Sequence, residues 1–290
     1  MKRIVFIITA LSMLSIVSCN NEKLDNIDKG VKEFVAYTDV QTKATLAEDG
    51  LSTVWEDGDE ISINDVNYIT YQGGPCGIFT FNNAPIINDG KFPATNPFYA
   101  GYPYAYILSH NEECIEFGNH IYYDEDNNEY FLNVDNDRFV DGFFSIAYNE
   151  EEPVLKFKNI MSVLKFKVPD KYSEDIKSIE ISVDNTSGNN ALENNTLDDS
   201  ALGADMTVHY NNGEPVIVDM LDINYSCILR DNSNKSNKFE LGGIYYVPLI
   251  PGKKKDLTFK INGKEVGKIN EIVCKRSVIH NLGTLPTGSN

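Results

Sequence analysis

The chain has 290 residues, of which 42% are apolar and 23% are charged, and this composition is typical of a folded protein and excludes an intrinsically disordered one. Its length predicts about two domains, because a domain usually holds roughly 100–200 residues. The formal net charge of −18 argues against a nucleic-acid partner, since phosphate backbones are also negative.

The chain begins with the features of a secretion signal. Basic residues precede an apolar run from Ile4 to Val17, which is too short to span a membrane. The run ends in Ile16-Val17-Ser18-Cys19, which resembles the bacterial lipobox. That resemblance implies cleavage before Cys19 and attachment of acyl chains to this residue, and diacylation gives stable membrane anchoring. We therefore expect residues 1–18 to be a signal peptide; a cleaved signal with an incidental cysteine is the alternative.

Residues 19–31 are expected to form a tether. The stretch from Asn20 to Gly30 is polar and rich in Asn and Asp, which favours a flexible linker. After it, short apolar–polar alternations are separated by Gly, Asn, Asp and Pro, a pattern typical of strands joined by turns. No mature stretch of the chain has sustained helical periodicity, so we predict an all-β protein built from β-sandwiches.

The clearest strand signal lies around residue 160, where apolar side chains alternate with lysines. Alternate side chains of a strand point to opposite faces, so one face is expected in a core. The acidic stretch from Asn149 to Pro153 is typical of an exposed linker. We therefore expect an N-terminal sandwich over residues 32–150 and a C-terminal sandwich over residues 151–290. Alternating apolar positions include Ile61, Ile63, Leu155, Phe157, Leu164, Phe166, Ile179, Ile181, Met206, Val208, Leu257 and Phe259.

Four cysteines remain after Cys19. An exported chain can keep disulfide bonds. Because two cysteines fall in each expected domain, Cys76–Cys114 and Cys227–Cys274 is the natural pairing among the three that four cysteines allow. Four buried thiols are the alternative. Zinc is not expected, because the spacing lacks CxxC and CxxH patterns.

The sequence lacks the motifs of common enzymes. It has no GxSxG, HExxH, P-loop or GxGxxG pattern, and its four histidines are scattered. We therefore predict no catalytic residues, no cofactor and no metal site. The densest acidic segment, from Asp124 to Asp141, could offer oxygen ligands to calcium, but Glu129 stands where an EF-hand needs glycine. Solvated hairpin turns are the simpler interpretation, because Asn and Asp tolerate left-handed backbone.

Tyrosines cluster just before residue 107. Exposed tyrosines can stack on sugars or anchor protein contacts, whereas buried tyrosines in a sandwich do neither. The core interpretation is favoured. The candidates for an exposed platform are Tyr99, Tyr102, Tyr104 and Tyr106.

Several segments together resemble the fimbrillin-like proteins of anaerobic Gram-negative gut and oral bacteria. With the lipobox, the resemblance spans nearly the whole chain. It implies two transthyretin-like β-sandwich domains and a role as a fimbrial subunit of the stalk, anchor or tip. Within it, Trp55 is expected to be a core anchor. The segments are Thr42-Lys43-Ala44-Thr45-Leu46, Val54 to Ile63, Leu155 to Phe166, and Ile279 to Leu285.

In stalk members of that family, an arginine-specific protease removes an N-terminal strand, and a strand from a neighbouring subunit fills the groove. Here no Arg occurs between Arg3 and Arg138, so Lys43 is the only basic candidate for the cut. This departure favours a tip or anchor role, or a surface lipoprotein that never polymerises, over a stalk role. The candidate exchanged strand contains Phe34, Val35, Ala36, Tyr37 and Val40.

The resemblance leads to one expected function and one alternative. The expected function is a structural or adhesive component of cell-surface fimbriae, a tip, anchor or minor pilin, assembling by β-strand exchange and held at the outer membrane by the lipid on Cys19. Its partners would be other fimbrial subunits and a host or bacterial surface protein or glycan. The alternative is a surface glycan-binding lipoprotein of a nutrient-uptake system. An enzyme ranks third.

Overall fold

The computed structural model describes residues 30–38, 45–46, 53–83, 87–88, 91–135, 143–184, 200–231 and 238–287. Within these ranges the regular structure consists of strands and of the 3-10 turns η2 (Tyr104–Tyr106) and η4 (Asn211–Gly213), so the predicted all-β class is confirmed. None of the helices in these ranges combines the length and the apolarity that a membrane crossing needs. The signal peptide and Cys19 lie outside the described residues.

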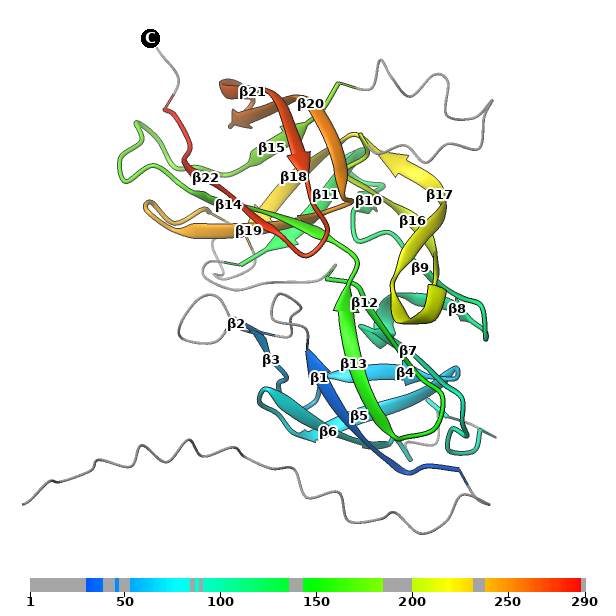
Figure 1. Ribbon diagram of the computed structural model, residues 1–290. Coiled ribbons are helices and arrows are strands. Elements are labelled where there is room, and N and C mark those ends of the chain that lie inside the picture. Colours follow the sequence, from blue (N-terminus) through cyan, green and yellow to red (C-terminus); the bar gives the residue numbers. More distant parts are fainter. Residues whose placement is uncertain are drawn as a thin grey trace, which may run out of the picture.

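The lower part of the molecule in Figure 1 is a closed barrel with the strand order β1-β13-β12-β7-β4-β5-β6, in which β6 pairs with β1. Alternating apolar residues predict such strands but not the closure of the ring, so a barrel stands where the first sandwich was expected. The strands are β1 (Glu33–Thr38), β4 (Glu60–Ile63), β5 (Val66–Gln72), β6 (Cys76–Phe81), β7 (Phe98–Tyr102), β12 (Ser145–Asn149) and β13 (Val154–Asn159).

Aromatic side chains fill the barrel. Trp55 is only 2% exposed, which confirms its expected place in the core. Its ring lies edge-on to Phe79, Tyr102 and Phe157, with centroids 4.9, 5.2 and 5.3 Å away. Each edge-to-face pair of aromatic rings stabilises the fold by about 0.5–1.5 kcal/mol in addition to the stabilisation from the apolar area that the rings bury. The indole therefore joins strands that are far apart in the sequence.

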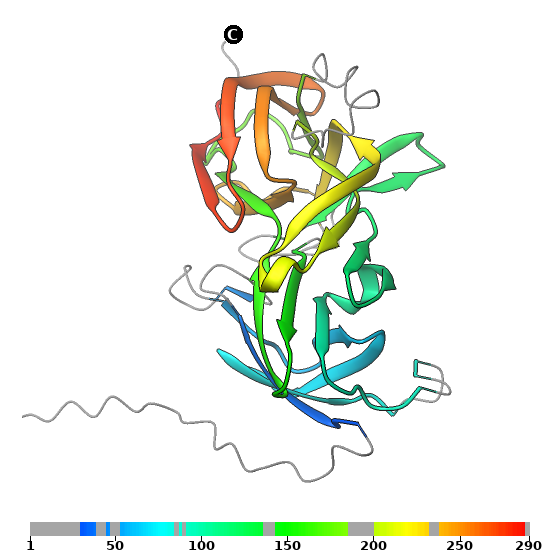
Figure 2. The same cartoon turned by 45° about the vertical axis from the view of Figure 1, so that its right-hand side comes forward.

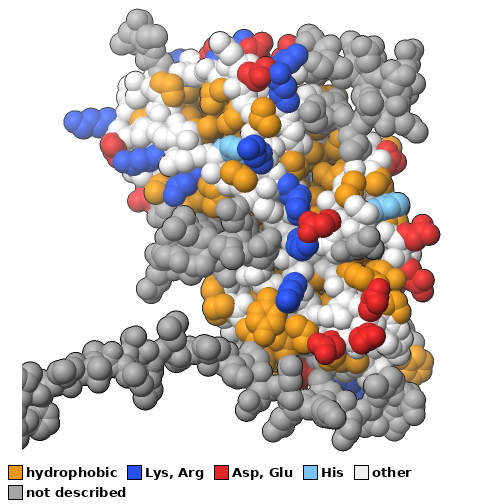
Figure 3. Space-filling model, in the orientation of Figure 1, with side chains coloured by type: hydrophobic (Ala, Val, Ile, Leu, Met, Phe, Trp, Pro, Cys, Tyr) orange, Lys and Arg blue, Asp and Glu red, His pale blue; other side chains and the backbone are white. Residues whose placement is uncertain are grey.

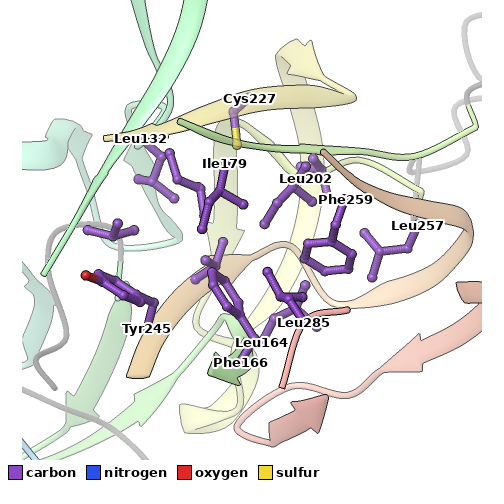
Figure 4. Packing of buried hydrophobic residues seen from close by; sticks show 14 of the residues in the cluster. Leu132, Leu164, Phe166, Ile179, Leu202, Cys227, Tyr245, Leu257, Phe259 and Leu285 are labelled. Atoms are coloured by element: carbon purple, nitrogen blue, oxygen red, sulfur yellow. The ribbon is translucent and has the colours of Figure 1, made fainter. Parts of the chain in front are cut away.

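Two further sheets face each other in the upper part of Figure 1, as expected for a sandwich. Their inner side chains meet in one buried cluster, where Phe166 packs against Tyr245 and Phe259 at centroid distances of 6.0 Å (Figure 4). The first sheet has the order β10 (Tyr122–Asp124), β11 (Glu129–Val134), β18 (Ser226–Asp231), β15 (Ile179–Ser182), β20 (Gly252–Ile261) and β21 (Lys264–Cys274), and the second has the order β19 (Ile244–Leu249), β14 (Ser162–Lys167) and β22 (Ile279–Thr284).

A four-stranded sheet lies between these two parts (Figure 2). Its apolar face packs with Phe144 and Ile146 in a third buried cluster, and Phe117 stacks on Phe144 at 4.8 Å. The two residues of β2 (Thr45–Leu46) and of β3 (Thr53–Val54) form a separate pair. The order of the four-stranded sheet is β17 (Val216–Asn224), β16 (Gly203–His209), β9 (Cys114–Phe117) and β8 (Ile107–His110).

Strand pairing crosses the expected boundary between residues 150 and 151. Strand β13 follows that boundary but lies in the barrel, while β9 and β11 precede it and pair with β16 and β18 of the second half. The acidic stretch is a hairpin turn and not a linker, because Asn149 closes it. The Asn149 Oδ1 accepts the N–H groups of Glu151 and Glu152, and its Nδ2 donates to the carbonyl of Val154.

Candidate functional site

The position of β1 makes this strand the candidate functional site. It pairs in parallel with β13, where Val35 lies opposite Val154, and antiparallel with β6, where Glu33 lies opposite Thr80. Both edges of β1 are therefore bonded. Removing this one strand would open the barrel and leave backbone groups of two neighbours without partners, which is costly when they are buried.

The inward side chains of β1 fill an aromatic slot. Phe34 and Ala36 are completely buried, while Val35 and Tyr37 are partly exposed on the outer face. The Phe34 ring lies edge-on to the rings of Tyr68 and Phe98, at 5.0 and 4.9 Å. Phe34 and Ala36 thus form the inner face of this barrel strand, and Val35 and Tyr37 lie on its outer face.

Ala36 leaves room for the indole of Trp55. The Trp55 Nε1–H donates a hydrogen bond to the carbonyl of Ala36 at 2.9 Å. Gly77 lies opposite Ala36 on β6, and a Cβ added to Gly77 would come within 2.7 Å of the indole. Two small residues on adjacent strands therefore form the recess that holds this ring.

Residues just before β1 tie it to the barrel. The Tyr68 hydroxyl donates to the carbonyl of Val31 at 2.6 Å and accepts the N–H of Ala94 at 2.8 Å. The N–H of Val31 donates to the carbonyl of Ala94 at 2.7 Å. Burial raises the pKa of Tyr68 well above its usual value, so this hydroxyl stays protonated at physiological pH. Val40 and Lys43, which complete the expected exchange segment and cleavage site, lie outside the described residues.

The four clustered tyrosines do not form one exposed platform. Tyr106 is buried, and Tyr102 packs on Trp55 while its hydroxyl donates to Asp59 at 3.2 Å. Tyr99 is partly buried and packs against neighbouring tyrosines. The more exposed tyrosines lie elsewhere, and alternation alone does not reveal which strand face meets solvent. They are Tyr71, Tyr123 and Tyr130, with exposures of 51%, 50% and 46%.

The acidic segment forms a hairpin between β10 and β11 that is held by an arginine. The Arg230 guanidinium lies 2.6 Å from both the Asp124 and the Glu129 carboxylates and stacks 3.9 Å from the Phe131 ring. A hydrogen bond from Asn127 and the contact with Arg230 lower the pKa of Asp124 to about 2. The described residues contain no group of three or more ligands arranged for a metal ion. These contacts give the acidic side chains a role in closing the hairpin.

The predicted disulfide pairs are wrong. Cys114, Cys227 and Cys274 are free thiols, so neither pair forms. Cys76 lies in the barrel and Cys114 in the four-stranded sheet, while two strands separate Cys227 from Cys274. That separation places their strands about 14 Å apart, and a disulfide tolerates no more than about 7 Å between Cα atoms. Burial raises the pKa of the Cys227 thiol to about 12, which makes it unreactive.

One buried polar cluster escaped sequence reasoning. His110 Nδ1 lies 3.0 Å from the Ser62 hydroxyl and accepts the N–H of Asp65, so its Nε2 carries the proton and donates to the Tyr210 hydroxyl at 2.6 Å. The pairing of Ser62 with a histidine resembles that of a nucleophile with its base, but Ser62 is completely buried and cannot meet a substrate. The cluster joins β4 of the barrel to β8 and to the residues after β16.

No family model and no curated protein matches the chain. A solved structure of a "putative cell adhesion protein" from Bacteroides ovatus shares 12% identity at a TM-score of 0.45, over 88% of this chain and 93% of the other. Another "putative cell adhesion protein", from Bacteroides fragilis, shares 14% identity at a TM-score of 0.42, over 86% and 91%. A fimbrial protein from Bacteroides ovatus shares 11% identity at a TM-score of 0.34, over 90% and 50%. At such low similarity, a function for this chain has to come from its own residues.

Proposed function

We propose that the chain is a structural or adhesive component of cell-surface fimbriae, held at the outer membrane through Cys19, and that β1 is the strand it exchanges with other subunits. The observation that carries the proposal is the position of β1. This strand comes first in the barrel, bonds to a neighbour on each edge, and places only Phe34 and Ala36 fully inside. A strand with these properties can be replaced by one from another chain, because backbone pairing does not depend on side chains.

The slot defines what a replacing strand must carry. An aromatic ring is needed where Phe34 meets Tyr68 and Phe98, and burying such a ring contributes about 1.5–3 kcal/mol. Two positions later the strand needs a small residue, since Trp55 occupies the space beside Ala36. The expected partner strand therefore has the pattern aromatic, any residue, small.

The place of the subunit within a fimbrium follows from its basic residues. The sequence has no arginine between Arg3 and Arg138, which leaves Lys43 as the only basic candidate for a cut after β1. A subunit that keeps its first strand cannot accept one from a neighbour in the same slot. An uncut chain would therefore be a terminal subunit, a tip or an anchor, whereas a chain cut at Lys43 would take a neighbour's strand in place of β1.

The first test is N-terminal sequencing of the protein from purified surface fibres and from the membrane fraction. A chain that starts near Ala44 in fibres would support exchange after a cut at Lys43. A chain that starts at lipidated Cys19 in both fractions would support an uncleaved anchor. Recovery from membranes alone, with no association with fibres, would overturn the fimbrial proposal.

The slot itself can be tested with peptides. A variant that lacks residues 30–38 is mixed with a synthetic peptide of residues 30–40 or with the same peptide carrying Phe34→Asp. We expect the unchanged peptide to raise the melting temperature of the variant and the Asp peptide to have no effect. Equal effects of both peptides would contradict specific strand replacement.

The glycan-binding alternative has one observation in its favour. Tyr123 and Tyr130 are about half exposed on the β10–β11 hairpin, and their ring centroids are 5.1 Å apart. Exposed tyrosines can stack on sugar rings. In affinity gel electrophoresis, a polysaccharide in the gel slows a protein that binds it. If the protein is slowed and the double change Tyr123→Ala and Tyr130→Ala abolishes the slowing, the glycan-binding alternative gains over the fimbrial proposal.

A further inference from the structure

Strand β17 is a long sheet edge in the described part of the chain. It is the outermost strand of the four-stranded sheet, is nine residues long, and among the described strands it pairs only with β16. Three other edges of the described sheets have features that discourage addition of a strand: β10 and β8 have only three and four residues, and β19 contains Pro248. Strand β17 contains no Lys, Arg or Pro.

Two irregularities in its pairing with β16 determine which side chains of β17 face outward. The inward positions are three residues apart and pack on the buried cluster beside the barrel: Ile217, Met220 and Ile223. The outward apolar side chains are Val216, Val218 and Leu221, with exposures of 40%, 42% and 64%. Figure 3 shows hydrophobic side chains on the surface where β16 and β17 lie in Figure 1. An exposed aliphatic row on a sheet edge is a common feature of protein contact sites.

Acidic side chains set the kind of partner. Asp219 is exposed between Val218 and Leu221, and Asp222 is exposed directly after Leu221. A second copy of the chain would bring identical carboxylates together, and each copy carries a net charge of −18, so self-pairing is unfavourable. We propose that β17 binds an extended segment of another protein in which apolar residues alternate with Lys or Arg. Such a segment would lie along the open edge, place its apolar residues on Val218 and Leu221, and pair its cations with the two aspartates.

The probe for the test is a labelled peptide of nine residues in which Val and Lys alternate, and its control has Glu in place of Lys. Binding to the purified protein is followed by fluorescence anisotropy at low and at physiological salt. We expect the lysine peptide to bind and the glutamate peptide not to bind. The double change Asp219→Asn and Asp222→Asn should weaken binding by roughly five- to tenfold, as expected for the loss of two exposed ion pairs.

Two further variants locate the site. Leu221→Lys should abolish binding, whereas Val273→Lys, on the exposed edge strand β21, should leave it unchanged. Far-ultraviolet circular dichroism establishes that each variant folds. Absence of binding, equal binding of both peptides, or equal loss in the two lysine variants would overturn the proposal. Light scattering measures whether the wild-type protein is a dimer. A wild-type dimer that becomes a monomer in the Leu221→Lys variant would also overturn the proposal, because a second copy of the chain would then occupy the edge of β17.

Discussion

Two histidines occupy surroundings that oppose their protonation. His120 is completely buried against the ring of Phe144, its Nε2 lies 3.2 Å from the carbonyl of Pro248, and its Nδ1 has no hydrogen-bond partner. Burial lowers the pKa of His120 and that of His110 to about 4. Both side chains are therefore neutral in the folded protein at pH values where an unfolded chain already binds protons.

The stability of the protein should consequently fall with acid. A histidine with a folded pKa of about 4 and an unfolded pKa of 6.5 contributes its full stability above pH 6.5 and loses it as the pH falls towards 4. The loss amounts to about 3 kcal/mol for such a shift. We expect the melting temperature to drop between pH 7 and pH 4.5, and to drop less in His120→Gln, which cannot titrate. An equal drop of the melting temperature in the variant would exclude His120 as a source of the acid sensitivity.

Replacing Trp55 should destabilise the barrel strongly. The change Trp55→Ala removes three ring contacts and the hydrogen bond to Ala36, and loss of a buried aromatic side chain typically costs about 3–5 kcal/mol. Urea unfolding followed by circular dichroism measures the change. Leu108→Ala serves as the control, because Leu108 is 63% exposed and its loss should cost no more than about 0.5 kcal/mol.

At the scale of the element, the sequence predicted strands better than it predicted their neighbours. The alternation of Leu155 and Phe157 with lysines correctly indicates a strand with one buried face. Nothing in that pattern reveals that β13 runs parallel to β1, which precedes it by more than a hundred residues. The turn at Asn149 has the composition of a linker, because glutamates and a proline suit an exposed hairpin turn as well as an exposed linker.

The recess between β1 and β6 makes a further prediction. Gly77→Ala would place a methyl group 2.7 Å from the indole of Trp55, and overpacking of this kind costs about 1–3 kcal/mol. Gly118→Ala is the matched control, since the nearest atoms to its Cβ would be those of the exposed Leu108 side chain at 3.3 Å and the carbonyl oxygen of Tyr106 at 3.6 Å. Melting temperatures of the two variants should therefore differ clearly. A Gly77→Ala protein as stable as the control would mean that the indole can move.

At the scale of the whole molecule, the sequence predicts the class and the aromatic core but not the connections between sheets. Trp55 was expected in the core and is buried there. Contacts such as Ser62 with His110, and the pairing of β11 with β18, join distant parts of the chain and have no local signal. Long-range pairing is set by the packing of all strands together, which no single window of residues contains.

This interlocking should prevent the two halves from folding alone. A fragment of residues 30–150 lacks β13, which the barrel needs, and a fragment of residues 151–290 lacks β9 and β11, which pair with β16 and β18. We expect each fragment to give the amide proton spectrum of an unfolded chain, and an equimolar mixture to regain dispersed signals. A well-dispersed spectrum from either fragment by itself would contradict this.

The way β1 lies in the barrel has a mechanical consequence. Figure 1 shows the described chain entering at the lower end of the molecule with β1 and leaving at the opposite end after β22. A pull on the entering chain acts along β1. The backbone hydrogen bonds of β1 to β13 and to β6 would therefore be loaded in shear and would share the force, instead of breaking one after another. A protein held by its first residues against flow would thus resist tension where its chain begins.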